Sequence, residues 1–191
     1  MSAPTGLTIW QKIAKRIRVP LGFLFAGTYF WIARPSGHSL LSSLFLVLPG
    51  IALRGYASGY VKKNAELTTT GPYAYTRNPL YLGSMLIAFG FAVASRNPWI
   101  ACALAILFAM IYAPTILGEE AYLRARFQEF DAYAKMVPRL LPRLSFRKQP
   151  GETALRGQFS WTLYLLHREY NSVLGSLILY CALIARMLWW R

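Results

Sequence analysis

The chain has 191 residues, of which 55% are hydrophobic and only 15% are charged, and its mean hydropathy is +0.34. This composition excludes an ordinary soluble domain. The net charge of +14 could indicate nucleic acid, but the basic residues flank apolar runs, where insertion rules and anionic lipid headgroups account for them. We therefore expect a membrane protein without a nucleic-acid partner.

Five apolar runs predict a bundle of membrane helices. In chain order they cover approximately Val19 to Ala33, Ser39 to Leu53 or on to Val61, Leu80 to Ser95, Trp99 to Leu117, and Ser172 to Trp190. A full span takes about 20 apolar residues, so the last two runs suffice by themselves. The shorter runs require snorkelling arginines, a locally thinner bilayer or burial against neighbours. We expect an all-α integral membrane bundle of about five helices that forms one domain over residues 1–191.

The distribution of basic residues predicts the orientation of this bundle. Of the 21 lysines and arginines, all but Arg34, Arg96, Arg186 and Arg191 lie before the first run, between the second and third, or between the fourth and fifth. The N-terminus and both long loops are therefore predicted to be cytoplasmic. No cleavable signal pattern precedes the first run.

Cysteines and histidines give no sign of a metal site. Cys102 and Cys181 lie within apolar runs, where a thiol behaves as a small hydrophobic group. His38 and His167 have no neighbouring ligands at metal-binding spacing. The sequence also lacks the glycine-rich and Ser-His-Asp motifs of the usual soluble enzymes.

The connector GPYAYTRNPLYLG, Gly71 to Gly83, concentrates polar aromatic residues between two apolar runs. Its Asn-Pro pair is a helix start, with asparagine at the N-cap and proline at the first helical position. The tripeptide Arg-Asn-Pro recurs at Arg96 to Pro98 without surrounding tyrosines. Helix initiation therefore leaves Tyr73, Tyr75 and Tyr81 unexplained. They form either an interfacial aromatic belt or a binding site.

A second polar cluster, LGEEAYLRARFQEF, ends the fourth run. Because 38 positions separate Tyr81 from Glu119, a helical hairpin brings both clusters to one membrane face. Glu119 and Glu120 point about 100° apart on a helix, so one can meet a ligand while the other pairs with a basic side chain. The alternative is a solvated acidic start to a cytoplasmic helix.

The two clusters together resemble a known enzyme family. LTTTGPYAYTRNPLYLG and EEAYLRARFQEFDAYAKMVPRLLP are similar to the two signatures of the isoprenylcysteine carboxyl methyltransferase and phospholipid methyltransferase family, over about residues 60–142. The C-terminal helical segment, about residues 159–191, lies outside the resemblance. The family resemblance implies an integral membrane enzyme that uses S-adenosylmethionine (SAM) without a Rossmann fold.

The resemblance also implies site residues. Cofactor contacts are expected from Ala65, Glu66, Leu67, Thr68, Tyr73, Asn78, Pro79, Leu80, Tyr81 and Glu119. Glu120 is expected to accept a proton from an amine acceptor, and Arg139, or Arg77, to hold a carboxylate acceptor. Two positions depart from the family: Asn78 replaces a histidine, and Thr115 replaces an arginine assigned to substrate.

The expected function is SAM-dependent methyl transfer to a lipophilic acceptor, of isoprenylcysteine carboxylate or lipid amine type. Cofactor would reach the site from the cytoplasm, and acceptor from the bilayer. One alternative is a reductase-like membrane protein that binds a nicotinamide cofactor. Another is a non-catalytic scaffold or transporter.

Overall fold

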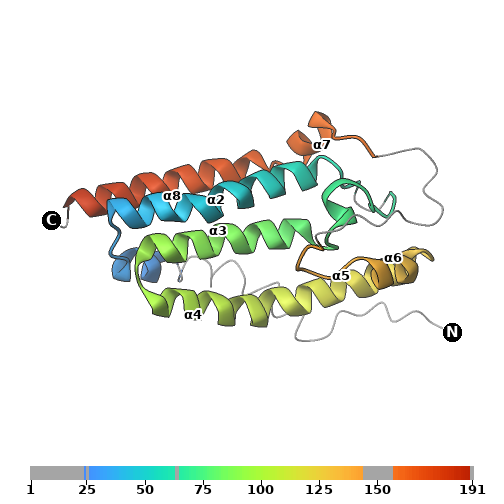
Figure 1. Cartoon of the computed structure of the whole chain (residues 1–191), viewed down its shortest axis with the longest axis horizontal. Coiled ribbons are helices and arrows are strands. Elements are labelled where there is room, and N and C mark those ends of the chain that lie inside the picture. Colours follow the sequence, from blue (N-terminus) through green and yellow to red (C-terminus); the bar gives the residue numbers. More distant parts are fainter. Residues whose placement is uncertain (1–23, 25, 63–64, 144–156, 190–191) are drawn as a thin grey trace.

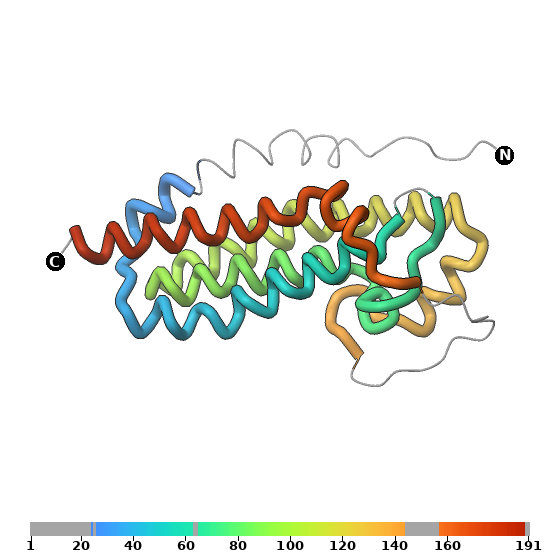
Figure 2. Tube along the Cα trace, turned by 90° about the horizontal axis from the view of Figure 1, so that it is seen from above, coloured from blue at the N-terminus to red at the C-terminus, as the bar shows by residue number. Residues whose placement is uncertain are grey.

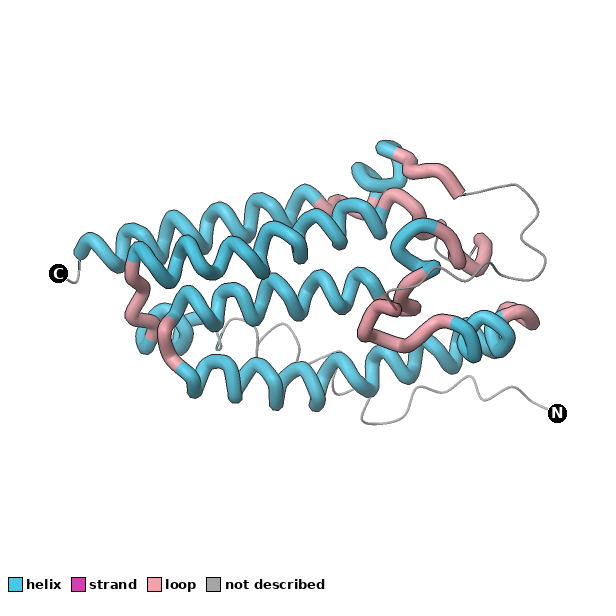
Figure 3. The backbone as a smooth tube through the Cα atoms, in the orientation of Figure 1, coloured by secondary structure: helices cyan, strands magenta, loops and turns pink. Residues whose placement is uncertain are grey.

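A computed structural model describes residues 24, 26–62, 65–143 and 157–189 of the chain. Within these ranges every regular element is a helix and none is a strand (Figure 3). Much of the expected first span lies outside the described residues, and residues 26–32 of it are helical.

The long helices run alongside one another, and the longer connecting loops gather at one end of the bundle, opposite the short α3–α4 turn (Figures 1 and 2). The long-helix elements are α2 (Gly37–Ser58), α3 (Pro79–Ser95), α4 (Pro98–Leu107), the π-helix η2 (Phe108–Tyr112), α5 (Ala113–Arg126) and α8 (Tyr170–Trp189). Three short helices lie at the loop end: η1 (Gly71–Ala74), α6 (Phe130–Met136) and α7 (Trp161–Leu166).

Three of the described helices are long and apolar enough to cross a bilayer: Gly37–Ser58, Pro98–Arg126 and Tyr170–Trp189. Pro79–Ser95 is apolar but shorter. Large apolar side chains such as Phe45 and Trp99 face outward, 84% and 76% exposed, as expected of surfaces in contact with lipid. The all-helical membrane fold is confirmed, whereas the count of five and the orientation remain predictions.

The helix that contains the fourth apolar run is longer than the run itself. Its apolar run stops at Leu117, but one continuous helix extends from Pro98 to Arg126. The sequence EEAYLRAR that follows the run is polar yet rich in strong helix formers, so helix propensity carries the helix past the end of the apolar segment.

Glycines allow α2 and α3 to pack with their backbones close together. A Cβ atom on Gly50 would lie 2.8 Å from the carbonyl oxygen of Gly83, and one on Gly90 would lie 2.5 Å from Cγ2 of Val47. Small residues at helix contacts serve this purpose in membrane bundles. The glycines thereby fix the start of α3 against α2.

Polar contacts attach the C-terminal helix to this pair. Arg54 of α2 binds Glu169, which precedes α8, with a shortest separation of 2.9 Å between Nη2 and Oε2. Farther along, the hydroxyls of Ser43 and Tyr180 lie 2.6 Å apart. The C-terminal helical segment, which lies outside the family resemblance, is thus joined to the core of the bundle.

Candidate active site

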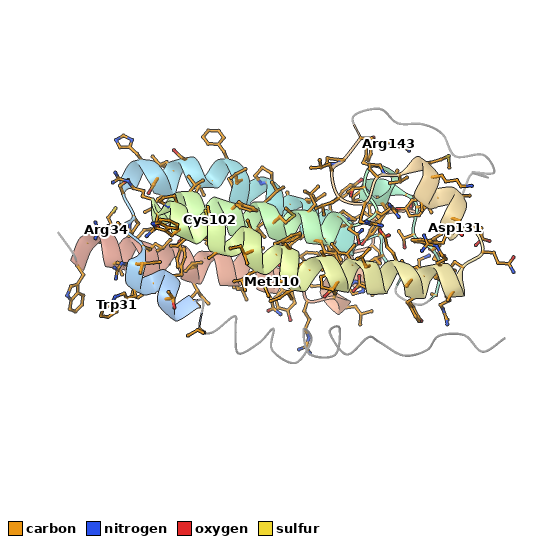
Figure 4. All side chains as sticks on the ribbon, turned by 90° about the horizontal axis from the view of Figure 1, so that it is seen from below. Trp31, Arg34, Cys102, Met110, Asp131 and Arg143 are labelled. Atoms are coloured by element: carbon orange, nitrogen blue, oxygen red, sulfur yellow. The ribbon has the colours of Figure 1, made fainter. Side chains whose placement is uncertain are left out.

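The two polar clusters meet at the loop end, as the helical hairpin predicted. The hydroxyl of Tyr81, in the first turn of α3, donates to Oε1 of Glu119 in α5 at 2.8 Å. Both residues line a cavity of about 260 Å³. This end of the molecule, marked by Asp131 and Arg143 in Figure 4, carries polar side chains from several elements.

The two adjacent glutamates have different surroundings. Glu120 is 4% exposed, and its carboxylate lies 3.2 Å from Nη1 of Arg77 and 3.0 Å from Nη2 of Arg139. Glu119 is exposed to the cavity, and no lysine or arginine of the described residues forms an ion pair with it. The expected pairing of one glutamate with basic side chains is therefore found at Glu120.

Aromatic rings form a further part of the site. The ring of Tyr81 packs edge-on against Tyr112, with centroids 5.6 Å apart, and Tyr112 stacks on Phe108 at 4.9 Å. Tyr112 and Phe108 both belong to η2, whose π-helical turn ends two residues before Pro114. Proline has no N–H to donate to the carbonyl four residues earlier, which favours such a local widening. Tyr112 was not among the residues predicted from the sequence. The nearby Pro114, which interrupts the helical hydrogen bonds, was the feature that could have drawn attention to this turn.

The segment after α6 holds the first polar cluster in place. The backbone N–H of Arg77 donates to the carbonyl of Pro138 at 2.9 Å, and the hydroxyl of Thr76 donates to Leu140 at 2.9 Å. Arg143 extends this contact, donating to the carbonyls of Met136 at 2.7 Å and Ala74 at 3.2 Å. These contacts bring Arg139 to Glu120.

Two buried tyrosines form part of the cavity wall and are joined to each other. The hydroxyl of Tyr133 in α6 donates to the backbone carbonyl of Tyr73 in η1 at 2.7 Å. Burial raises the pKa of both phenols further above their ordinary value, so both keep their protons even in alkaline solution. The sequence analysis did not identify Thr76, Tyr133 or Arg143, because their partners are backbone carbonyls far along the chain.

The two Arg-Asn-Pro copies differ in what their asparagines do. Both asparagines occupy the N-cap position, as predicted. The Asn97 side chain accepts from the N–H of Trp99 at 3.0 Å, whereas the Asn78 side chain makes no cap and donates instead to the carbonyl of Arg139 at 2.9 Å. Side-chain capping by Asn78, as the helix-start interpretation implied, is therefore wrong. This asparagine is used to join the two polar clusters.

Most of the predicted site residues lie on the cavity wall. The wall includes Glu66, Leu67, Thr68, Tyr73, Asn78, Pro79, Leu80, Tyr81, Glu119 and Glu120 from the prediction, together with Val61, Lys62, Arg77, Tyr122, Leu123, Phe130 and Tyr133. Ala65 and Arg139 are not part of it. Arg139 lies against Glu120, and its hydrogen bonds to that carboxylate raise its pKa.

Several known proteins are similar to this chain in sequence. The phospholipid methyltransferase family model matches residues 36–129. The cobalt-zinc-cadmium resistance protein CzcN of Cupriavidus metallidurans is 32% identical over 162 residues, which are 81% of this chain and 71% of that protein. The nickel-cobalt-cadmium resistance protein NccN of Alcaligenes xylosoxydans xylosoxydans is 38% identical over 109 residues, 56% of this chain and 50% of the relative.

A eukaryotic enzyme is also similar. The protein-S-isoprenylcysteine O-methyltransferase of Schizosaccharomyces pombe is 29% identical over 123 residues, 64% of this chain and 48% of that enzyme. The chain thus matches about half the length of this enzyme and of the nickel-cobalt-cadmium resistance protein. No solved structure matches the chain significantly.

The helical membrane fold and these similarities define the protein as a membrane methyltransferase. The chain belongs to the phospholipid methyltransferase family, whose members include relatives named isoprenylcysteine methyltransferases. The resemblance inferred from the two polar clusters is confirmed.

Proposed function

We propose that the protein transfers a methyl group from SAM to a lipophilic acceptor that reaches the site from the bilayer, with the cofactor bound in the cavity at the loop end. The observation that carries this proposal is the contact between Tyr81 and Glu119. This contact brings the two polar clusters together on the wall of one cavity. The family to which the chain belongs consists of methyltransferases, which supports the choice of reaction.

The charges on the cavity wall suit SAM, which carries an ammonium, a carboxylate and a sulfonium. Glu119, with no cationic partner among the described residues, would bind the ammonium. Nε of Arg77 is buried and donates to no acceptor within the described residues, so it could donate to the cofactor carboxylate. The ring of Tyr81, which lies on the cavity wall and is held in place by Tyr112 behind it, would attract the sulfonium.

The contacts of Glu120 argue against its expected role as a proton acceptor. Its two oxygens accept three hydrogen bonds from Arg139, and Arg77 adds an ion pair. A general base needs a free lone pair within reach of the substrate proton. We therefore assign Glu120 to positioning Arg77 on the cavity wall, and we assign Arg139, which lies off the wall, to supporting Glu120.

The same charge pattern favours an amine or neutral acceptor over a carboxylate. The wall carries two cations, Lys62 and Arg77, and each is paired, with Glu66 at 3.1 Å and with Glu120 at 3.2 Å. Thr115, where the family resemblance implies an arginine, donates to the carbonyl of Ile111. A carboxylate acceptor would lack a cation of its own, so a lipid amine is the acceptor class proposed here.

Bound SAM supplies an already activated methyl group. The neutral amine would give its lone pair to the methyl carbon, S-adenosylhomocysteine would leave with the electron pair of the carbon–sulfur bond, and the proton of the resulting ammonium would pass to water after the transfer. The protein's contribution is to hold the reacting atoms in line and to exclude water. The basic loops at this end, predicted to be cytoplasmic, suit access by a soluble cofactor.

The metal-resistance names of two relatives suggest a different role, in tolerance to cobalt, cadmium and related metals. Within the described residues no group of three or more His, Cys, Asp or Glu side chains is placed to hold a metal ion. The cavity is therefore assigned to methyl transfer.

Calorimetric titration of the detergent-purified protein with S-adenosylhomocysteine tests the cofactor site. Glu119→Ala should abolish detectable binding, and Tyr81→Phe should weaken it about tenfold, as expected for the loss of a hydrogen bond to a charged group. Glu129→Ala removes an exposed carboxylate outside the cavity and is the matched control. Failure of the unmodified protein to bind in several detergents and lipids would sink the proposal.

Transfer of a labelled methyl group then tests the acceptor class. Vesicles of phosphatidylethanolamine present a lipid amine, and a farnesylated cysteine presents a carboxylate. Labelling of the amine lipid is expected. If only the farnesylated cysteine is labelled, the proposed cofactor site still stands. The proposed acceptor class, a lipid amine, is then wrong.

A further inference from the structure

A second, larger cavity lies at the end of the bundle opposite the candidate active site. It has a volume of about 730 Å³ and is lined by Trp31, Ile32, Ala33, Arg34, Pro35, Arg96, Asn97, Arg186 and Met187. Three of these are arginines, and none of these lining residues, all within the described part of the chain, is acidic. Three like charges thus converge on one concave surface.

The arginines come from three separate parts of the chain. Arg34 precedes α2, Arg96 lies in the turn between α3 and α4, and Arg186 lies near the end of α8. In the sequence, only Arg34, Arg96, Arg186 and Arg191 are placed on this side of the predicted membrane spans. Three of these four arginines therefore line the same cavity. Independent surface charges that only contact water would have no reason to gather in one cavity.

Backbone contacts hold the arginines in position. The N–H of Arg34 donates to the carbonyl of Ser95 at 2.9 Å, so residues 34 and 96 are held close together. The guanidinium of Arg186 donates to the carbonyls of Ala33 at 2.7 Å and Trp31 at 2.6 Å. Arg96 has a left-handed backbone with φ of 53°, a conformation uncommon for residues other than glycine. The backbone at residues 34 and 96 and the guanidinium of Arg186 are therefore held in place, and the side chains of Arg34 and Arg96 are exposed.

Exposed tryptophans indicate where this cavity lies relative to a bilayer. Trp31, Trp99 and Trp189 are 78%, 76% and 90% exposed, and all three lie at this end of the bundle. Figure 4 shows Trp31 and Arg34 together at the end opposite Arg143. Tryptophans concentrate at the level of the lipid headgroups. The exposed tryptophans therefore indicate that the arginine cavity lies at the depth of lipid phosphates.

We propose that this cavity binds a phosphate group, carried by the headgroup of an anionic membrane lipid. Guanidinium groups donate paired hydrogen bonds to phosphate oxygens and hold them more specifically than a lysine does. The apolar lining residues Ile32 and Met187 would contact the adjoining lipid chain. The site is separate from the cavity assigned to methyl transfer and does not depend on that assignment.

Native mass spectrometry of the full chain tests the proposal by titration with phosphatidylglycerol in an excess of phosphatidylcholine. The variant Arg34→Gln/Arg96→Asn removes two charges, and asparagine tolerates the left-handed backbone at position 96. Loss of two interfacial cations should weaken phosphatidylglycerol binding about 25-fold, or about fivefold for each. Arg126→Gln/Lys135→Gln removes two exposed charges at the other end and should leave this binding unchanged.

Inorganic phosphate distinguishes the two sources of a phosphate group. If the lipid is the ligand, millimolar phosphate should not displace phosphatidylglycerol. Displacement that requires Arg34 and Arg96 would assign the cavity to a soluble phosphate instead. Equal binding of phosphatidylglycerol by the unmodified chain and by a folded Arg34→Gln/Arg96→Asn variant, or no preference over phosphatidylcholine, overturns the proposal.

Discussion

Replacing Glu120 by glutamine separates a positioning role from a role as a proton acceptor. The side chain of Glu120 is 5% exposed, and its two cationic partners differ in burial: Arg77 is 12% exposed and Arg139 is 50% exposed. Removing one member of a buried ion pair costs about 3–5 kcal/mol, because the other charge remains buried without compensation. Since Arg139 can turn to water, mainly Arg77 is affected. We expect the free energy of unfolding to fall by about 3 kcal/mol, at the lower end of this range.

Thermal unfolding in one detergent measures this effect. For a chain of this length, 1 kcal/mol corresponds to about 2–4 °C in Tm, so Glu120→Gln should lower Tm by about 6–12 °C. Arg139→Gln removes the half-exposed partner and should lower Tm by less than about 4 °C, as expected for a pair near the surface. Glu129→Gln, at an exposed position, should leave Tm unchanged.

Activity completes this test. If Glu120 positions Arg77, Glu120→Gln should weaken binding of S-adenosylhomocysteine along with stability. An unchanged Tm and unchanged affinity, combined with loss of methyl transfer, would refute the positioning role and restore Glu120 as the proton acceptor.

Two other predictions concern packing and pH. Gly50→Ala should destabilise the protein by about 1–3 kcal/mol, because its Cβ atom would lie 2.8 Å from the Gly83 carbonyl oxygen. At Gly175 a Cβ atom would meet nothing within 4 Å, so Gly175→Ala should instead stabilise α8 by about 0.5–1 kcal/mol in the same unfolding assay. The hydrogen bond with Tyr56 raises the pKa of Tyr60 to about 12 from 10.0, so this contact should stabilise the folded state below pH 10 and lose its effect between pH 10 and 12. Tyrosinate absorbance should show one phenol titrating near pH 12 that moves toward pH 10 in Tyr56→Phe, and an unchanged titration curve would contradict the assignment.

The helices and the meeting of the two polar clusters can be predicted from the amino-acid sequence. Apolar runs specify membrane helices because the bilayer leaves few other ways to satisfy the backbone. The 38 positions between Tyr81 and Glu119 allow one helix across the membrane, a tight turn and one helix back. The two residues therefore return to the same membrane face, where their side chains are in contact. The two motifs by themselves indicate the family.

The partner of each polar side chain depends on the tertiary structure. Glu120 rather than Glu119 faces the arginines because of the helical twist of α5 and the position of residues 136–143. Asn78 reaches the Arg139 carbonyl instead of capping its own helix, although its local sequence matches that of Asn97. The cavity of Arg34, Arg96 and Arg186 likewise depends on how three helix ends pack. Local sequence determines local helices, but contacts between distant residues depend on the register and rotation at which the helices pack.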